Sequence, residues 1–348
     1  MNYTEETTRF DCMGDMLVGI LAKPEIPADT GVVVIVGGPQ YRAGSHRQFV
    51  LLSRTLAAAG YAVLRFDYRG MGDSEGQRRD FQTVSSDIAA AISTLQQQLT
   101  LSKKVILWGL CDGASAALLY LHETRDPRVV GLCLLNPWVR SEVTLARTQV
   151  KHYYTRRLMQ KEFWIKLLRG GVARTALLGL VRNIRVSLGG SPGLGAEQPA
   201  EGPPATPFQH RMAAAWVTFS GTIFLLLSSE DFTAKEFLEY ARTDASWKTA
   251  LNHPRLVCHT VQGADHTFSS PLARVEMENA TLQLGLPKRD QMGQNLKPST
   301  GLSNRCAISD VPRKQETGVD WTPYIENSQS VKTVLVRNLV PPSCDEMR

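Results

Sequence analysis

One run of five residues has the pattern of a reactive turn. The segment Gly-Leu-Cys-Asp-Gly at 109–113 follows an apolar stretch and precedes a stretch of small residues. It matches the pattern G-x-S-x-G, with Cys111 in place of the serine. A sharp turn from strand to helix lifts one side chain above a sheet, and the helix N-terminus that follows favours a thiolate. The segment predicts Cys111 as a nucleophile, with a packed core cysteine as the alternative.

A cysteine nucleophile needs a base, and the base needs an acid to orient it. In sites of this kind the nucleophile, acid and base follow in that chain order, each after a strand. Asp231 follows the apolar run 222–227, and His266 follows the run 256–261. The sequence therefore predicts that Cys111, Asp231 and His266 form a catalytic triad. Two alternatives stay open: Asp231 serves only as a helix cap, or Glu230 is the acid.

Acyl chemistry also requires N–H donors that hold a developing oxyanion. The first predicted donor is the backbone N–H of Asp112, directly after the nucleophile. The second lies in the Gly-Gly-Pro-Gln loop at 37–40, after an apolar run. The proline has no N–H, so Gly38 is the predicted donor and Gln40 the second choice, unless the loop is only a tight turn. No C-x-x-C, G-x-G-x-x-G or Walker pattern is present, so neither a metal nor a cofactor is expected.

The elements that must position these residues alternate between strand and helix through residue 138. This order predicts an α/β fold with a mostly parallel sheet and helices on both faces. Strands are expected at 8–12, 16–22, 32–36, 61–68, 105–108, 129–135, 222–227 and 256–261. Helices are expected at 49–59, 81–99, 113–122, 233–245 and 272–284. Residues 212–229 lack charge, but polar residues interrupt them, which favours a helix end running into a buried strand over a membrane span.

The length of 348 residues predicts two domains, or one large α/β domain with insertions. Apolar residues make up 43% and charged residues 21%, which excludes collagen-like, wholly disordered and coiled-coil chains. Six scattered cysteines do not form a disulfide scaffold. The predicted division is a core at 1–138 and 208–287, an inserted segment at 139–207, and a poorly ordered tail at 288–348.

With these motifs, the chain resembles the α/β-hydrolase superfamily. The matching segments include the loop at 37–40, the turn-rich Asp-Tyr-Arg-Gly-Met-Gly-Asp-Ser at 67–74 and the cysteine turn at 109–113. Over residues 5–287 the chain resembles the exosortase A system-associated hydrolase family, type 1. That resemblance implies a bacterial cytoplasmic hydrolase that accompanies exopolysaccharide production. The cysteine turn is also similar to that of dienelactone hydrolases, although Asp112 departs from their motif.

The inserted segment is basic. Residues 139–190 hold eleven Lys and Arg against two acids, a charge of +9, whereas the whole chain carries +6. In the fold that the resemblance implies, such an insertion forms a helical lid over the site. Its charge suggests an anionic small-molecule or acyl-carrier substrate, or an anionic membrane surface, while a solvated helical face stays open. No nucleic-acid partner is expected, because no binding module for DNA or RNA is present.

These residues together predict a hydrolase in which Cys111 attacks the carbonyl of an ester or thioester. An acyltransferase stays open, as does a non-enzymatic scaffold that docks on a membrane or an acidic partner through the basic lid. The first 23 residues lack the pattern of a signal peptide, so a cytoplasmic location is expected, with contact at the inner face of the membrane open.

Overall fold

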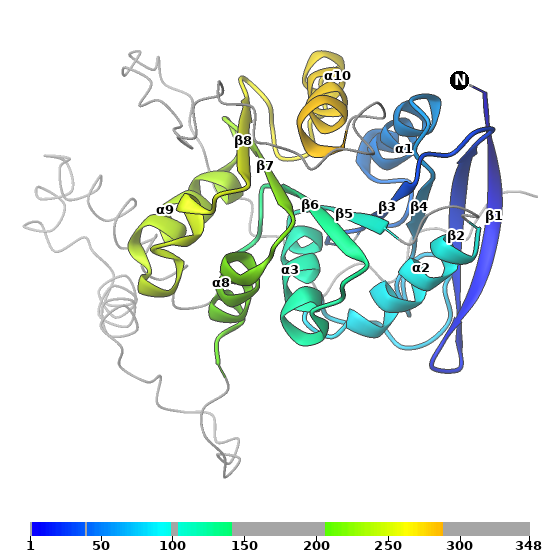
Figure 1. Cartoon of the computed structure of the whole chain (residues 1–348), viewed down its shortest axis with the longest axis horizontal. Coiled ribbons are helices and arrows are strands. Elements are labelled where there is room, and N and C mark those ends of the chain that lie inside the picture. Colours follow the sequence, from blue (N-terminus) through cyan, green and yellow to red (C-terminus); the bar gives the residue numbers. More distant parts are fainter. Residues whose placement is uncertain (1, 39, 99–103, 141–205, 288–348) are drawn as a thin grey trace, which may run out of the picture. The chain divides into compact units, whose positions relative to one another are not determined.

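A single sheet organises the residues described in the computed structural model, which are 2–38, 40–98, 104–140 and 206–287. Within them the sheet has eight strands in the order β1-β2-β4-β3-β5-β6-β7-β8 (Figure 1). The strands are β1 (Tyr3–Cys12), β2 (Asp15–Pro24), β3 (Thr30–Ile35), β4 (Val63–Phe66), β5 (Lys104–Leu110), β6 (Val129–Leu135), β7 (Thr222–Ser228) and β8 (Leu256–Val261). The β1–β2 hairpin is antiparallel, β2 pairs antiparallel with β4, and the remaining pairs are parallel.

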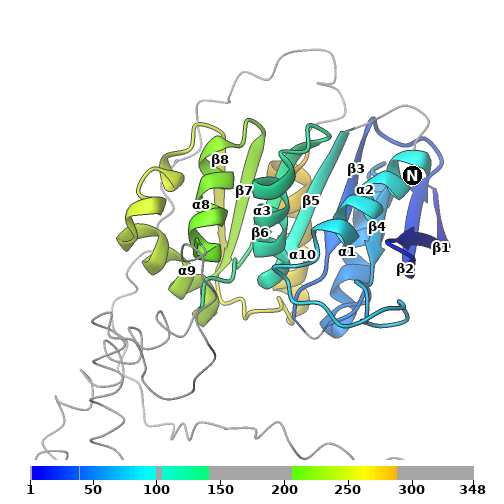
Figure 2. The same ribbon diagram turned by 90° about the horizontal axis from the view of Figure 1, so that it is seen from below.

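Helices cover both faces of this sheet. They are α1 (Gln48–Ala58), α2 (Ser85–Gln98), α3 (Asp112–Thr124), α8 (Phe208–Thr218), α9 (Phe232–Thr243) and α10 (Pro271–Ala280). Figures 1 and 2 show α2, α3 and α8 on one face and α1 and α10 on the other. Each face of the sheet has its own hydrophobic core, and alternate residues of β3 belong to different cores. Val33 packs on the side of α2, α3 and α8, and Val32 packs on the side of α1 and α10. Burial on both faces explains why all six residues of β3 are buried. The expected α/β fold with a mostly parallel sheet is confirmed.

The expected helix at 81–99 begins later in the structure, at Ser85. Asp80 causes the difference, because its carboxylate accepts the N–H of Gln82 at 2.9 Å and its carbonyl accepts that of Thr83 at 2.8 Å. This turn leaves Phe81 outside the helix, where its ring packs against that of Phe208 at 5.3 Å between centroids. Phe81 therefore fits the apolar spacing of the helix because it packs in the core, although it is not part of the helix.

The uncharged stretch 212–229 contains most of α8 and all of β7, as expected for a helix that runs into a strand. Within the described ranges, no helix combines the length and apolar character that crossing a bilayer requires. Most of the predicted lid, 141–205, and the tail 288–348 lie outside the described residues. Arg140 is the one basic residue of the 139–190 segment that the structure describes, and it pairs with Glu236 of α9 at 2.9 Å.

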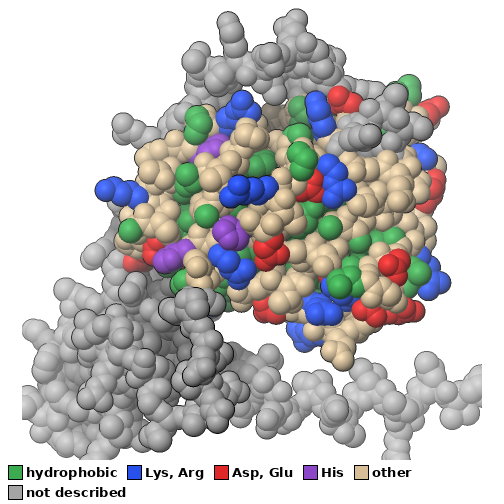
Figure 3. All heavy atoms as spheres, turned by 60° about the horizontal axis from the view of Figure 1, so that its bottom comes forward, with side chains coloured by type: hydrophobic (Ala, Val, Ile, Leu, Met, Phe, Trp, Pro, Cys, Tyr) green, Lys and Arg blue, Asp and Glu red, His purple; other side chains and the backbone are tan. Residues whose placement is uncertain are grey.

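Charge is mixed on the face of the sheet that carries α2, α3 and α8. Figure 3 shows both basic and acidic side chains spread over this face. No single sign gathers on its described part. The case for an anionic partner therefore rests on the composition of the inserted segment.

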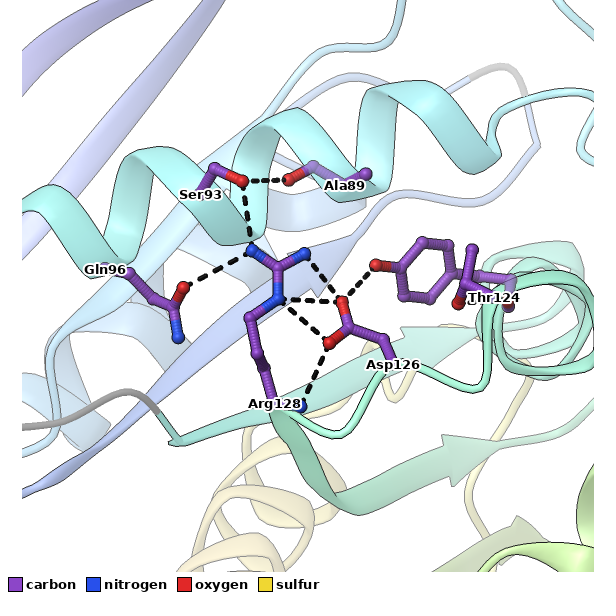
Figure 4. A network of polar contacts seen from close by, with 7 residues as sticks. Ala89, Ser93, Gln96, Thr124, Asp126 and Arg128 are labelled. Carbon is purple, nitrogen blue, oxygen red and sulfur yellow. Dashed lines mark hydrogen bonds and ion pairs between the residues drawn. The ribbon is translucent and has the colours of Figure 1, made fainter.

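A polar network fixes the start of β6 to α2 and α3 (Figure 4). The Asp126 carboxylate accepts Arg128 Nη2 at 2.6 Å and the Tyr120 hydroxyl at 2.5 Å. Arg128 also donates to Ser93 Oγ at 3.1 Å and to Gln96 Oε1 at 3.3 Å, both on α2. Burial, together with the bond to Asp126, raises the pKa of Tyr120 to about 12. The network holds β6 beside β5, the strand that leads to Cys111.

A buried ion pair fixes the loop after β4. Asp87, on the first turn of α2, is fully buried and accepts the backbone N–H of Arg69 at 2.8 Å and its Nη2 at 2.9 Å. The Arg69 side chain is only 4% exposed. Tyr68 directly precedes Arg69 and lines the cavity described below. The ion pair of Arg69 and Asp87 therefore also fixes the backbone next to Tyr68.

Removing Asp87 should destabilise the fold strongly. Asp87→Ala is expected to lower the free energy of unfolding by about 3–5 kcal/mol, because it leaves the buried Arg69 charge unpaired. Urea denaturation followed by circular dichroism measures this. Asp73→Ala is the control: it removes an acid from the same loop whose side chain is 69% exposed and bound to Arg42, and should cost less than about 1 kcal/mol. Equal losses in the two variants would contradict the assignment.

Candidate active site

Cys111 lies on a strained turn between β5 and α3. Its backbone has φ 60° and ψ −126°, a region that costs a residue other than glycine about 1–3 kcal/mol. The crowding around the turn enforces this conformation. A Cβ on Gly109 would lie 2.6 Å from the carbonyl of Gly113, and a Cβ on Gly113 would lie 2.5 Å from the Ile35 oxygen. The motif therefore lies between a strand and a helix, as its pattern predicts. Cys111 is partly exposed, whereas the free thiols of Cys12 and Cys133 are buried.

The structure brings together the three residues that the sequence proposed as a triad. Asp231 follows β7 and His266 lies in the loop after β8. His266 Nδ1 lies 2.8 Å from Asp231 Oδ2, and the Cys111 side chain lies close enough to the same imidazole to raise its pKa. Because parallel strands end at the same edge, residues more than 150 positions apart meet above the sheet.

Asp231 caps a helix and contacts His266 with the same carboxylate. Its carboxylate accepts the N–H groups of Thr233 at 3.0 Å and Ala234 at 3.2 Å, which caps α9, and it also holds His266. Asp231 is only 6% exposed. The hydrogen bonds from the backbone fix its carboxylate in the orientation that the imidazole needs. Glu230 is exposed, and its carboxylate accepts the Ser229 hydroxyl. The cap bonds and the contact with His266 are therefore compatible, and it is Asp231, not Glu230, that is bonded to the imidazole.

The imidazole of His266 is strongly basic in this setting. Its hydrogen bond to Asp231, followed by the effect of the nearby Cys111 side chain, raises its pKa to about 10 against the opposing effect of burial. His266 is therefore an imidazolium at neutral pH. A cation of this kind next to a thiol favours the thiolate, because the opposite charges attract.

Asn136 is a site residue that the sequence analysis missed. It is fully buried at the end of β6, with φ 42°. Its side-chain amide donates to Ser228 Oγ at 2.9 Å and to the His266 carbonyl at 3.3 Å, and its oxygen accepts the Ser228 N–H at 2.9 Å. It thereby joins the ends of β6 and β7 to the loop that carries the imidazole. The sequence carried a signal for this residue, because Asn136 is an amide residue directly after the wholly apolar strand β6.

A side chain occupies the position that the N–H of Gly38, one of the two predicted oxyanion donors, faces. The Gly38 N–H donates to Asp112 Oδ1 at 2.5 Å. Any Cβ on Gly37 would overlap that same oxygen and the Leu110 carbonyl, so the loop can approach only as glycine. The second choice, Gln40, accepts Nε2 of Gln48 on α1 at 3.1 Å and the Ser45 N–H before that helix at 3.2 Å through its side-chain oxygen.

A cavity of about 410 Å³ adjoins this position. Its apolar wall consists of Val36, Met71 and Phe81, and Gly38 and Asp112 border it on the side of the turn. The cavity is large enough for a small acyl group. Among the described residues, no group of three His, Cys, Asp or Glu side chains has an arrangement suited to a metal ion.

The sequence profile of the serine aminopeptidase family S33 matches residues 27–170. That description names a serine, whereas this chain has Cys111 on the turn. A lysophosphatidylserine lipase ABHD12 of Danio rerio is 34% identical over 86 residues, 25% of this chain and 22% of that protein. A quorum-quenching protein AidA of Acinetobacter baumannii is 29% identical over 131 residues, 36% of this chain and 42% of that protein. The match thus spans less than half the length of either relative.

Solved structures share the architecture. An esterase Pf2001 from Pyrococcus furiosus superposes with a TM-score of 0.52 at 16% identity, over 81% of this chain and 90% of that one. The α/β hydrolase GrgF from a Penicillium species gives 0.51 at 14% identity, over 81% and 97%. Est1E from Butyrivibrio proteoclasticus gives 0.50 at 15% identity, over 80% and 98%. These likenesses show that the chain has the α/β-hydrolase fold, as the sequence motifs suggested.

NMR can measure whether Asp231 or Cys111 raises the pKa of His266 more. NMR titration of the imidazole should give a pKa of about 10 in the unsubstituted protein. Asp231→Asn should lower that pKa toward the ordinary value of 6.5, and Cys111→Ala should lower it less, because Asp231 is the larger cause. Since the folded-state pKa is raised, the pairing stabilises the fold fully below about pH 6.5, and this contribution is lost as the pH rises through about 10.

Glu230→Gln is the matched control for this titration, because it neutralises a neighbouring carboxylate that does not hold the imidazole. It should leave the pKa of His266 unchanged. A pKa near 6.5 in the unsubstituted protein would show that the imidazolium described above does not form.

Proposed function

We propose that this protein is a cysteine-dependent hydrolase of carboxylic esters or thioesters. The observation that carries the proposal is the imidazole of His266, which is bonded to Asp231 through Nδ1 and whose pKa is raised by the nearby Cys111 side chain as well. Nucleophilic catalysis requires this chain of contacts, and a scaffold with no reaction does not need it. The names of similar proteins, an esterase and a lipase, support the same class of substrate.

Acylation starts from the pair of Cys111 thiolate and His266 imidazolium. The sulfur attacks the carbonyl carbon, a carbon–sulfur bond forms, and the π electrons move to the carbonyl oxygen. As the tetrahedral intermediate collapses, the bond to the leaving alcohol or thiol breaks, and His266 supplies its proton. The products of this half-reaction are an acyl thioester on Cys111 and a neutral His266.

Hydrolysis completes the cycle. Neutral His266 takes a proton from water as the water oxygen attacks the acyl carbon, and the carbon–sulfur bond then breaks to release a carboxylic acid. Acylation removes the contribution of Cys111 to the raised pKa of His266, so the imidazole can act as a base in this half-reaction. Asp231 keeps the ring oriented through Nδ1 in both halves.

Thioesters fit this nucleophile better than oxygen esters. A thiolate leaves more readily than an alkoxide, so an intermediate formed from an oxygen ester returns to substrate unless the alkoxide is protonated as it departs. With a thioester the two leaving groups are equivalent. An acyl group bound to a small thiol or to an acyl carrier protein is therefore the preferred substrate class.

The wider role that we propose follows from the sequence motifs. The segment from Val36 to Phe49 and the cysteine turn resemble those of hydrolases associated with the exosortase A system. This resemblance supports a role beside exopolysaccharide production, where a sugar hydroxyl could replace water as the acyl acceptor. We place the protein in the cytoplasm, with the basic segment 139–207 as the part that meets an anionic substrate or membrane.

The nucleophile assignment can be tested with acyl probes. The protein should hydrolyse p-nitrophenyl acetate and a small acyl thioester, and mass spectrometry should find the acyl adduct on Cys111. Cys111→Ala should abolish the adduct, and His266→Ala should slow acylation by about 10²–10⁴-fold, because His266 supplies the proton that the leaving group needs.

His259→Ala is the matched control, since His259 lies on β8 with its imidazole on Glu276 at 3.0 Å, outside the site. It should keep full activity. Hydrolysis that persists in Cys111→Ala would refute the proposal. Analysis of products with and without an added sugar acceptor separates hydrolysis from transfer.

A further inference from the structure

We propose that the carboxyl group of Asp112 is a gate on the oxyanion hole, which fills the hole in the free protein and must rotate into the adjoining cavity before Cys111 can be acylated. The proposal rests on the function proposed above. It concerns the side chain of Asp112, whereas the sequence analysis used only its backbone N–H.

The first observation is that the donors of the hole converge on this carboxylate. Gly38 N lies 2.5 Å from Asp112 Oδ1, and the backbone N–H groups of Gly113 and of Asp112 itself act on the same group. A carboxylate oxygen and the oxyanion of a tetrahedral intermediate need the same donors at the same place. Only one of them can be present at a time, so the observed rotamer is incompatible with catalysis.

The second observation is that the cost of burying this carboxylate is only partly compensated. Burial raises the pKa of Asp112 in spite of the three N–H groups, which means that the pocket compensates incompletely for the water that the charge has lost. No side-chain cation pairs with it among the described residues. Arg42 and Arg69, which are close in the fold, pair with Asp67 and Asp87 instead.

The third observation is that the cavity beside the hole contains partners for a displaced carboxylate. Tyr68 lines this cavity, and its hydroxyl is buried and has no hydrogen-bond partner in the described part of the chain. Burial, followed by the charge of Asp112, raises the pKa of Tyr68, so the phenol stays protonated and can donate. A buried hydroxyl without a partner is unfavourable, and a second position of the Asp112 carboxylate would satisfy it.

Arg78 and Arg79 line the same cavity and are exposed. Neither has an ion pair with any residue that the structure describes. A carboxylate that leaves the hole therefore moves toward a phenol that lacks an acceptor and toward two unpaired guanidinium groups. The gate thus has a closed position, which is observed, and an open position whose partners are already in place.

The test compares two reactions of the same sulfur. Acylation of Cys111 by p-nitrophenyl acetate needs the oxyanion hole, whereas alkylation by iodoacetamide is a displacement at a saturated carbon and does not. Alkylation of Asp112→Ala reports the effect of the lost charge on the sulfur alone. Acylation should rise by about tenfold or more beyond any change in alkylation, because the N–H donors also become available. Asp112→Ser serves as a second opening variant should the alanine variant melt at a lower temperature.

Added acetate gives a readout that a merely structural role of Asp112 would not produce. In Asp112→Ala, acetate should refill the hole and slow acylation, while the unsubstituted protein should not respond. Glu230→Gln, which neutralises a carboxylate away from Gly38, should behave as the unsubstituted protein in both reactions.

The outcomes separate the gate from the function on which it rests. If acylation of Asp112→Ala and Asp112→Ser rises no more than their alkylation does, the gate is wrong and the proposed function stands. If acetate has no effect on Asp112→Ala, the position between Gly38 and the turn is not an oxyanion hole. If Cys111 is not acylated in any variant, the proposed function fails, and the gate fails with it.

Discussion

The close approach of β3, β5 and the start of α3 is the constraint on which the site depends. Gly109 and Gly113 leave no room for a Cβ, and Gly37 would overlap the Leu110 carbonyl if it had one. This packing forces Cys111 into a positive φ and turns its side chain away from the sheet. The same contact carries the Gly38 N–H to the residue after the nucleophile, so one steric condition sets both the thiol and the donors.

The strand ends supply the remaining parts, and each polar residue there serves two purposes. Asp231 caps α9 and holds His266, so the helix and the imidazole share one rigid anchor. Asn136 satisfies the backbone of Ser228 and also fixes the loop of His266. Groups bound on several sides keep one rotamer, which is what a catalytic geometry requires.

Much of this arrangement was predictable from the sequence, because it follows from chain order and strand ends. The bounds of β8, and the positions of Asp231 and His266 after their strands, depend on apolar runs that are visible in the sequence. The late start of α2 was not predictable from periodicity, since the turn at Asp80 competes locally with the helix. The rotamer of Asp112 was hidden for another reason: its partner Gly38 is 74 residues away, and only the folded chain joins them.

The charges around Cys111 give the gate a second effect. The cation of His266 lies near the sulfur of Cys111, and Asp112, with its carboxylate, is the next residue after Cys111. A carboxylate in the hole repels a thiolate, whereas the imidazolium attracts it. Movement of the carboxylate toward Arg78 and Arg79 therefore frees the donors and also removes a repulsion from the attacking sulfur. A neutral plug of the same shape would release only the donors, so the charge of Asp112 couples access to the hole with the reactivity of the nucleophile.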